Sequence, residues 1–447
     1  MESRYSKYAE GAVQKAKKLG AEMAEAYIGN SKELVVDVRN GSLETMKLAE
    51  DRGMGIRVFT GGKTGFAFTT DFGDSAIDEV VRQALANASC AEPDPLRTLP
   101  VPAPSYQQMD LYDPCIKKAT VEQKIEMAKS MENEARAFDS RISVTESSTY
   151  QDGEVEVTLF NSNGINLHYL GAYCGMYIAL VAGQGEDSQT GFALGYGLRF
   201  AGLDPAKLGR QAAERAVRML GAKPGSTQKA PVVLDPYVAT GFLGLLAPAL
   251  SAEAVQKGRS LFAGKVGQQV GSGNINLIDD GTLKDGISSA PFDGEGVPTS
   301  RTVLIEGGVL KCFLHNTYTA AKDKVLSTGN GVRGSFKGTP EVGTTNFFIE
   351  PGAKKPEEII GEINNGFYVT EVMGMHTANP ISGDFSVGAS GLWIENGKLV
   401  RPVRGMAIAG NIMDLLKSVD AVGSDLQFFG GKGAPTIRVS EMSISGH

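Results

Sequence analysis

Residues 24–69 carry the clearest structural signal in the chain and read AEAYIGNSKELVVDVRNGSLETMKLAEDRGMGIRVFTGGKTGFAFT. Four runs within them have the composition of β-strands, at 24–28, 34–38, 56–59 and 65–69. Two of the breaks between the runs are Asn40-Gly41 and Gly61-Gly62, dipeptides typical of tight hairpin turns. The segment therefore predicts antiparallel strands joined by hairpins.

Helical patterns lie on both sides of these strands. The residues at 4–19 have helical spacing and end at Gly20, and a second helix is predicted at 75–89. Together they define a first α/β unit at 1–90. The next segment, 91–119, is rich in proline and predicts an extended linker.

A second unit, at 120–225, repeats the same order of helix, strands and helix. Thr120 and Gln123 form a capping-box pattern, strands are predicted within 142–199, and Asp204-Pro205 opens the closing helix. The tetrapeptide Thr-Gly-Phe-Ala occurs at 64–67 and again at 190–193. A degenerate internal duplication explains this match, and a chance identity of four residues remains the alternative.

The last segment, 230–447, has a different character. One helical stretch at 236–256 is followed by strands and turns, including hairpin turns at Gly307-Gly308 and Asn396-Gly397. Short helices are predicted at 356–364 and 410–419. The predicted fold class is therefore α+β: two related N-terminal α/β units, followed by a β-rich C-terminal domain of antiparallel strands.

Composition excludes several classes of protein. The 447 residues are 42% hydrophobic and 21% charged, with a net charge of -7, as expected for a folded soluble protein without a basic nucleic-acid-binding face. The N-terminus does not have the pattern of a signal peptide, and the apolar stretch at 237–252 is too short to span a bilayer. We therefore expect a cytoplasmic protein with neither a nucleic-acid nor a membrane partner.

Common catalytic motifs are missing or incomplete. The segment 329–334 matches the dinucleotide pattern G-x-G-x-x-G, but Gly338 and Pro340 follow too closely for the helix that such a site needs. No G-x-S-x-G elbow occurs, and none of the four histidines is followed by glutamate. The four cysteines are too widely spaced for a zinc ribbon or a disulfide framework.

One polar cluster, at 371–386, is a candidate site. It contains Glu371, His376, Asp384 and Ser386, side chains suited to general-base chemistry or to binding. On a strand, Asp384 and Ser386 would share one face while Phe385 points to the other. The alternative interpretation is a loop whose polar side chains satisfy its own turns.

Six motifs in order resemble a known family. They are KGRSLFAGKVG at 257–267, LIDDGTL at 277–283, DGEGVPT at 293–299, VLIEGGVL at 303–310, TGNG at 328–331 and SGDFS at 382–386. Taken together, they are similar to the TldD/PmbA family, once called modulators of DNA gyrase. The resemblance covers the chain from about residue 20 to its end.

The resemblance also indicates a branch of the family. The TldD branch has a metal-binding helix with the pattern His-Glu-x-x-x-His, whose positions fall here near Leu243, Gly244 and Pro248. None of these three residues binds zinc or activates water, and a metal-ligating cysteine near the TldD C-terminus has no match after Cys312. The chain therefore resembles the PmbA branch, also called TldE.

Membership of that branch implies a role as the non-catalytic subunit of a zinc metallopeptidase complex. Zinc is then expected in a TldD-like partner and not in this chain, and the substrates are small or unfolded peptides. A homodimer is expected when the partner is absent. Two alternatives stay open: an independent homodimeric hydrolase using His376, Asp384 and Glu371, and a non-hydrolytic regulator that binds gyrase or another protein.

Overall fold

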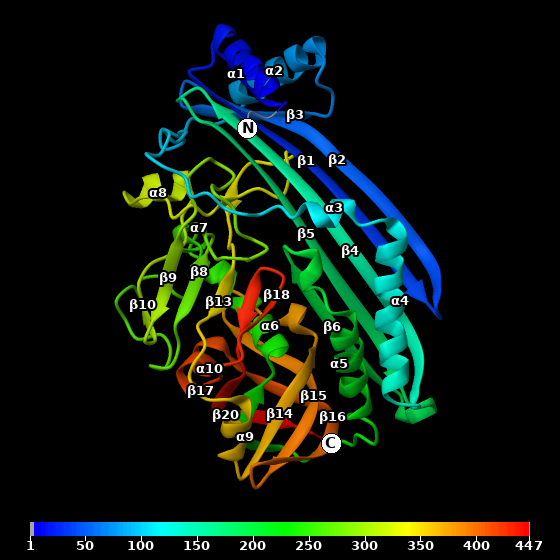
Figure 1. Cartoon of the computed structure of the whole chain (residues 1–447). Coiled ribbons are helices and arrows are strands. Elements are labelled where there is room, and N and C mark those ends of the chain that lie inside the picture. The colour runs from blue at the N-terminus through cyan, green and yellow to red at the C-terminus, as the bar shows by residue number, and fades with distance from the viewer. Residues whose placement is uncertain (1–3, 447) are drawn as a thin grey trace.

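A six-stranded antiparallel sheet forms the N-terminal half of the molecule in the computed structural model, which describes residues 4–446. The strand order is β3-β2-β1-β4-β5-β6, and the central pair β1–β4 joins the two predicted units into one sheet. Figure 1 shows these long strands curving beside the C-terminal half. The bounds are β1 Met23–Arg39, β2 Ser42–Thr60, β3 Lys63–Thr69, β4 Ile142–Asn161, β5 Asn166–Ala182 and β6 Gln189–Gly197.

The strands are longer than the sequence predicted. The runs at 24–28 and 34–38 are parts of the single strand β1, and the run at 56–59 is the end of β2. β1 continues through its polar middle because β2 and β4 pair with it there on both sides. Hydrogen bonds to both neighbouring strands satisfy the backbone groups of this polar stretch, where the local composition alone had predicted a break between two strands.

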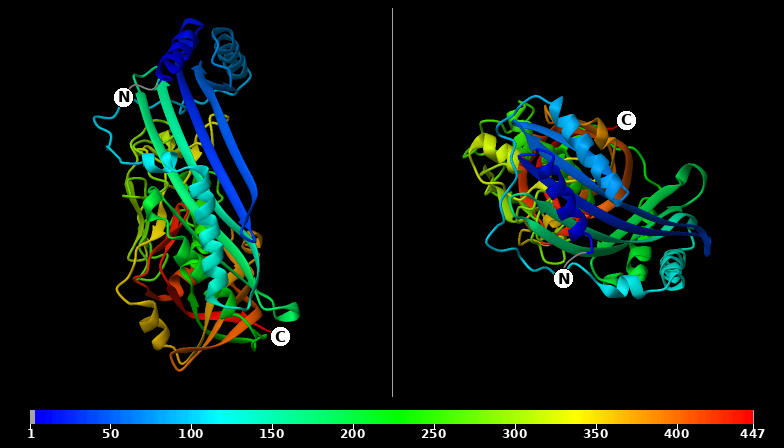
Figure 2. Two further views of the ribbon diagram at one scale, coloured as in Figure 1. Left: turned by 45° about the vertical axis from the view of Figure 1, so that its right-hand side comes forward. Right: turned by 90° about the horizontal axis from the view of Figure 1, so that it is seen from above.

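One face of this sheet is covered by helices. Even-numbered residues of β1, such as Ala24, Ile28 and Val36, are buried on that face, whereas odd-numbered residues point to the opposite face. The helices are α1 (Ser6–Lys18), α2 (Asp74–Ser89), α4 (Val121–Phe138) and α5 (Pro205–Val217). α1 and α2 lie at one end of the sheet and α4 and α5 along the rest, as two further views show (Figure 2).

Local signals for these helices are confirmed. α1 ends before Gly20, which has a φ of 103°. Thr120 accepts a hydrogen bond from the backbone N–H of Gln123 and completes the predicted capping box, and Asp204 caps α5. Each of these signals needs only a few neighbouring residues.

The two units also share one close contact between strand and helix. A side chain at Gly65 in β3 would overlap Ala84 and Ala88 of α2, and a side chain at Gly191 in β6 would overlap Ala212 and Ala216 of α5. These glycines are the second residues of the two Thr-Gly-Phe-Ala tetrapeptides, which lie in the two edge strands. The same contact at both edges favours an internal duplication over chance identity.

The C-terminal half contains two further six-stranded sheets and a short ladder of β11 and β12. The orders are β16-β15-β14-β7-β20-β17 and β10-β9-β8-β13-β19-β18. The strands are β7 Gln228–Leu234, β8 Leu277–Asp280, β9 Arg301–Glu306, β10 Val309–Leu310, β11 Gly331–Val332, β12 Glu341–Val342, β13 Phe347–Ile349, β14 Asn365–Met373, β15 Asp384–Glu395, β16 Lys398–Asn411, β17 Val419–Val422, β18 Gln427–Phe429, β19 Lys432–Ala434 and β20 Ile437–Ser445. A large apolar core draws buried side chains from both six-stranded sheets.

Short helices connect these strands. The helix predicted at 236–256 is broken into α6 (Pro236–Leu246), the 3-10 turn η3 (Ala247–Leu250) and α7 (Ala252–Gln256), because Pro248 lacks an N–H donor. α6 packs against β14 and β19, one strand from each sheet. The remaining helices and 3-10 turns are α3 Pro114–Lys118, η1 Gly185–Asp187, η2 Phe200–Gly202, α8 Thr317–Asp323, α9 Pro356–Gly361, η4 Met375–Thr377 and α10 Ile412–Ser418. No helix within residues 4–446 is long and apolar enough to cross a membrane.

Residues 331–338, a segment of the C-terminal half called the strap below, pack against the N-terminal sheet and so connect the two halves. Phe336 of the strap is 2% exposed and packs over Gly29, Gly53 and Gly55, on the helix-free face of the sheet. Side chains at Gly53 or Gly55 would overlap the strap, so the close approach requires glycine at both positions. The proline-rich linker also contacts both halves, since the hydroxyl of Tyr106 donates to the carbonyl of Gly296 at 3.0 Å.

Candidate functional site

The three positions at which the resemblance would place metal-binding residues, Leu243, Gly244 and Pro248, lie on and just after α6. Asp235 caps this helix by accepting a hydrogen bond from the N–H of Tyr237, and Pro236 occupies its first turn. Leu243 is 1% exposed and belongs to the core, whereas Pro248 is at the surface. The three positions therefore do not form one polar face directed at a common ion.

Lys432 lies beside Gly244, the second of these three positions. A Cβ atom placed on Gly244 would lie 3.3 Å from Nζ of Lys432, on β19. A positive charge at this distance opposes the binding of a metal cation. Among residues 4–446, no group of three His, Cys, Asp or Glu side chains is placed to hold a metal ion.

The candidate loop around His376 is next to α6. A Cβ on Gly241 of α6 would lie 3.5 Å from Cε of Met375, which begins the turn η4. Phe385 packs edge-on against Phe242 of α6, with ring centroids 5.0 Å apart. The loop around His376 therefore packs directly against α6.

The strand geometry predicted for Asp384 and Ser386 is present. Both side chains are exposed at the start of β15, while Phe385 between them is 5% exposed. His376 is also exposed and makes no hydrogen bond or ion pair within the described part of the chain. These three side chains thus remain accessible to a ligand or to a second subunit.

Asp384 is also part of the loop's own hydrogen bonding. Its carboxylate accepts from the hydroxyl of Ser382 at 2.8 Å and from Nδ2 of Asn411 at 2.8 Å. These bonds stabilise the ionised form and hold the pKa of Asp384 below its usual value. Asp384 therefore has a structural role in the turn, whether or not it also meets a ligand.

Glu371 lies apart from the other candidates. It is opposite Ser390 in the β14–β15 ladder, six residues from Asp384, a separation of about 20 Å along the strand. Burial raises the pKa of Glu371, which lines a small cavity of about 50 Å³ with Gln189 and Arg218. The grouping of Glu371 with His376 and Asp384 is not realised in the fold.

Sequence reasoning missed a buried ionic network between the two halves. Arg333 of the strap donates to Glu25 on β1, and Arg57 on β2 lies 3.0 Å from Glu25 and 3.3 Å from Glu295. All four side chains are between 1% and 8% exposed. The periodicity of β1 places Glu25 on the face opposite Ala24 and Ala26, and the residues that bury it there come from distant parts of the chain, so no local pattern indicated its burial.

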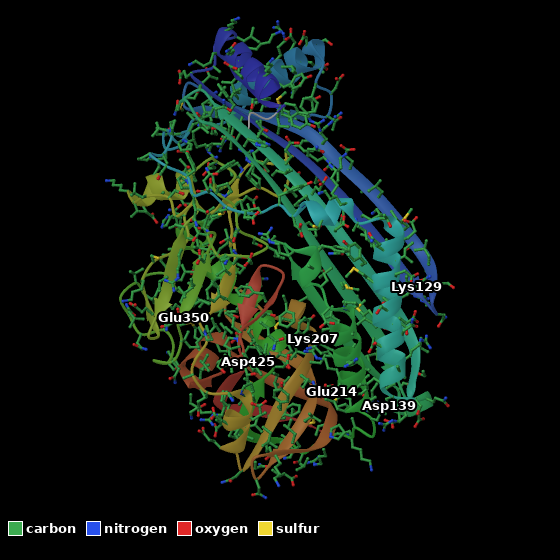
Figure 3. The ribbon with its side chains drawn as sticks, in the orientation of Figure 1. Lys129, Asp139, Lys207, Glu214, Glu350 and Asp425 are labelled. Carbon is green, nitrogen blue, oxygen red and sulfur yellow. The ribbon has the colours of Figure 1, made fainter. Side chains whose placement is uncertain are left out.

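A cleft of about 220 Å³ lies beside this network. Figure 3 draws the side chains of the molecule as sticks, and the residues that it labels, such as Lys207 and Glu350, lie outside the lining of this cleft. Tyr27, Tyr169 and Phe292 form aromatic walls, and Asp293 and Arg333 also line it. Two of the six motifs that carry the family resemblance, at 293–299 and 328–331, contribute residues to these walls. Burial, together with the nearby charge of Glu295, raises the pKa of Asp293 to about 7.

Comparisons with known proteins agree with this architecture. Three family models match in order: the PmbA/TldA metallopeptidase domain 1 at 24–88, the central domain at 116–220 and the C-terminal domain at 227–446. The chain is 29% identical to metalloprotease PmbA of Escherichia coli over 95% of this chain and 92% of that protein. It is also 26% identical to a Haemophilus influenzae homologue of metalloprotease TldD, over 95% and 92%.

Solved structures show the same fold. A Thermotoga maritima protein described as a candidate modulator of a DNA gyrase is 30% identical and superposes with a TM-score of 0.92, over 99% of this chain and all of that one. TldE from Thermococcus kodakarensis is 26% identical, with a TM-score of 0.91 over 98% and 100%. Fold and domain order thus define a protein of metallopeptidase type.

The chain belongs to the PmbA/TldA metallopeptidase family, which is the TldD/PmbA family indicated by its motifs. The expected fold class is confirmed: α/β units precede a β-rich C-terminal domain. Relatives carrying the names PmbA and TldE connect the family with peptidase activity.

Proposed function

We propose that this chain is a PmbA/TldE-type subunit of a cytoplasmic zinc metallopeptidase that acts on small or unfolded peptides. In this proposal, a TldD-like partner holds the zinc, and this chain contributes binding surface without a metal of its own. The main support is the region of α6, where Leu243, Gly244 and Pro248 replace the metal-binding pattern and Lys432 adds a positive charge. The family membership supplies the expected reaction class.

The exposed loop beside α6 suggests how the chain would take part. His376, Asp384 and Ser386 extend the surface that begins at Gly241 and Gly244. We propose that this surface faces the cleft of the catalytic partner. An extended peptide bound there would meet hydrogen-bonding side chains without requiring a catalytic group from this chain.

A dimer is part of the proposal. β2 exposes Leu43, Met46 and Leu48, of which Leu48 is 75% exposed, along an edge that β3 does not cover. Exposed apolar side chains on an unpaired strand edge are typical of association surfaces. We expect an interface of more than about 2,000 Å² in total, and a two-fold homodimer when the partner is absent. Light scattering at micromolar concentration should give the mass of a dimer, and a monomeric mass would contradict this part.

Co-expression with a TldD-like subunit carrying His-Glu-x-x-x-His tests the function directly. The purified complex should cleave unstructured peptides, with about one zinc per pair of chains, and the isolated chain should do neither. Stoichiometric zinc and peptidase activity in the isolated chain would favour an independent hydrolase instead. A pull-down that recovers gyrase and no TldD-like subunit would favour the binding regulator.

A further inference from the structure

One carboxylate in the cleft beside the strap has no cationic partner. Glu25 and Glu295 are compensated by Arg57 and Arg333 within the buried network. Asp293 lies next to them and is 8% exposed, but it forms no ion pair with any residue in 4–446. It accepts hydrogen bonds only from the backbone N–H groups of residues 295, 297 and 331. A buried carboxylate of this kind is stabilised by a cation.

The walls of the cleft are aromatic. The rings of Tyr169 and Phe292 lie edge-to-face with centroids 5.2 Å apart, and Tyr27 completes this side. Tyr27 is only 9% exposed, and its hydroxyl has no hydrogen-bond partner within the described residues. Aromatic faces next to a carboxylate are a common way of binding an organic cation. The unpaired hydroxyl offers a further acceptor to an N–H donor.

The cationic side chain in the wall is not free to bind an anion. Arg333 donates from Nε to the carbonyl of Gly294 at 2.6 Å and from Nη1 to the carbonyl of Gly338 at 3.0 Å. Its Nη2 donates to Glu25. An anionic ligand would therefore meet Asp293 without a free positive charge to offset it, and a neutral ligand would leave the Asp293 carboxylate without a counter-charge.

We infer that the cleft lined by Tyr27, Tyr169, Phe292 and Asp293 binds a protonated amine. The ammonium would lie between the Asp293 carboxylate and the rings of Tyr169 and Phe292 and donate to the Tyr27 hydroxyl, since the Tyr27 ring already packs against the Arg333 guanidinium. The volume of about 220 Å³ is below the range of typical drug-sized ligand sites, so it suits a short alkylammonium group. The amino end of a peptide, a lysine side chain and a free aliphatic amine share this chemistry. The inference does not depend on the proposed peptidase function.

Calorimetric titration of the whole chain with n-butylamine and with n-butanol isolates the contribution of charge, because the two molecules have similar size. A pH of 8 keeps butylamine protonated and lies above the pKa of about 7 to which burial raises the Asp293 carboxyl. We expect saturable binding of butylamine and at least tenfold weaker binding of butanol. Equal binding of both, or binding of neither, would overturn the inference.

Three peptides distinguish the sources of the amine: tri-alanine, N-acetyl-tri-alanine and an N-acetylated tripeptide with one lysine. Binding of tri-alanine alone identifies an amino terminus, and binding of the lysine peptide alone identifies a side chain. Butylamine binding without either peptide identifies a free amine. Binding of N-acetyl-tri-alanine as tight as that of tri-alanine and the lysine peptide would contradict recognition of the charge.

Substitutions at Asp293 and Tyr27 test whether these two side chains bind the amine. Asp293→Asn should lower affinity for butylamine at least tenfold, although the new amide nitrogen faces the N–H of Gly331 and weakens that turn. Tyr27→Phe keeps the ring under Arg333 and removes only the hydroxyl, so it should lower affinity about threefold in a folded protein. Tyr8→Phe, on the exposed surface of α1, is the matched control. Unchanged affinity in both cleft variants would overturn the assignment, and if Asp293→Asn does not fold, Tyr27→Phe and the butanol comparison decide.

Discussion

Arg333 donates a hydrogen bond to Glu25 although 308 positions separate them in the sequence. Both side chains are 1% exposed, and the contact joins the strap to the first strand of the N-terminal sheet. Arg57 and Glu295 extend the contact into a network of two acids and two bases. Charges buried in this way depend on one another, because removing one leaves its partner without compensation.

Arg333→Ala should therefore destabilise the protein by about 3–5 kcal/mol, since it leaves the Glu25 carboxylate buried beside one remaining base. Denaturant unfolding monitored by circular dichroism gives the change in the free energy of unfolding. Lys337→Ala is the control within the same strap, because its pair with Asp51 is about half exposed and should contribute less than about 1 kcal/mol. Equal losses in the two variants would argue against a buried network that joins the halves.

Gly65→Ala and Gly191→Ala test the contact shared by the two N-terminal units. In each case the added methyl group would meet the backbone of the packed helix, so we expect losses of about 1–3 kcal/mol at both positions. Gly11→Ala provides the opposite control: it lies on the exposed side of α1 with open space around it, and alanine favours a helix. That change should stabilise the protein by about 0.5–1 kcal/mol. A large loss at only one of the two edges would weaken the case for equivalent units.

The pKa of Asp293 predicts a specific pH dependence. Burial raises the pKa of this carboxyl to about 7, well above its unfolded value of about 3.9. Between those values the folded state keeps a proton that the unfolded state releases, so this group's contribution to stability is present below about pH 4 and is lost as the pH rises through about 7.

Asp293→Asn removes this titration. The unfolding free energy of the wild type minus that of the variant should fall from pH 4 to pH 7 and level off above it. Urea unfolding at closely spaced pH values measures this difference without added amine. A difference that increases over the same range would show that Asp293 is ionised in the folded state throughout.

The surface beside α6 makes a prediction about activity. In a reconstituted complex with a TldD-like subunit, alanine at His376 and Asp384 should lower kcat/KM for a peptide about tenfold, equivalent to about 1.4 kcal/mol. The melting temperature of the isolated chain should change little, because both side chains are exposed. If the double variant unfolds instead, the hydrogen bonds of Asp384 to Ser382 and Asn411 are its main role.

A substitution elsewhere in the same turn distinguishes a binding role of His376 and Asp384 from a purely structural one. Ser382→Ala removes one hydrogen bond to Asp384 but leaves His376 and the Asp384 carboxylate in place. It should preserve most of the activity if the loop binds peptide or partner. Loss of activity equal to that of the double variant would indicate that the turn geometry alone matters.

Local sequence patterns correctly predicted the features that depend on a few neighbouring residues. The capping box of Thr120 and Gln123 and the turn at Asn396-Gly397 form where predicted, because the groups that stabilise them lie within three or four positions. The order of motifs also indicated the family, and the alternation around Phe385 placed Asp384 and Ser386 on one exposed face.

Contacts between distant residues follow from the packing of the whole fold and could not be predicted from local patterns. β1 runs unbroken through Gly29 because two neighbouring strands satisfy its backbone, and no local pattern carries that information. The register of β14 with β15 places Glu371 far from Asp384, although both lie in one polar stretch of sequence. Glu25, Arg57, Glu295 and Arg333 form one network because the strap crosses the sheet where glycines let it approach. The free energy of these ion pairs depends on burial, and the four side chains become buried only when the two halves pack together.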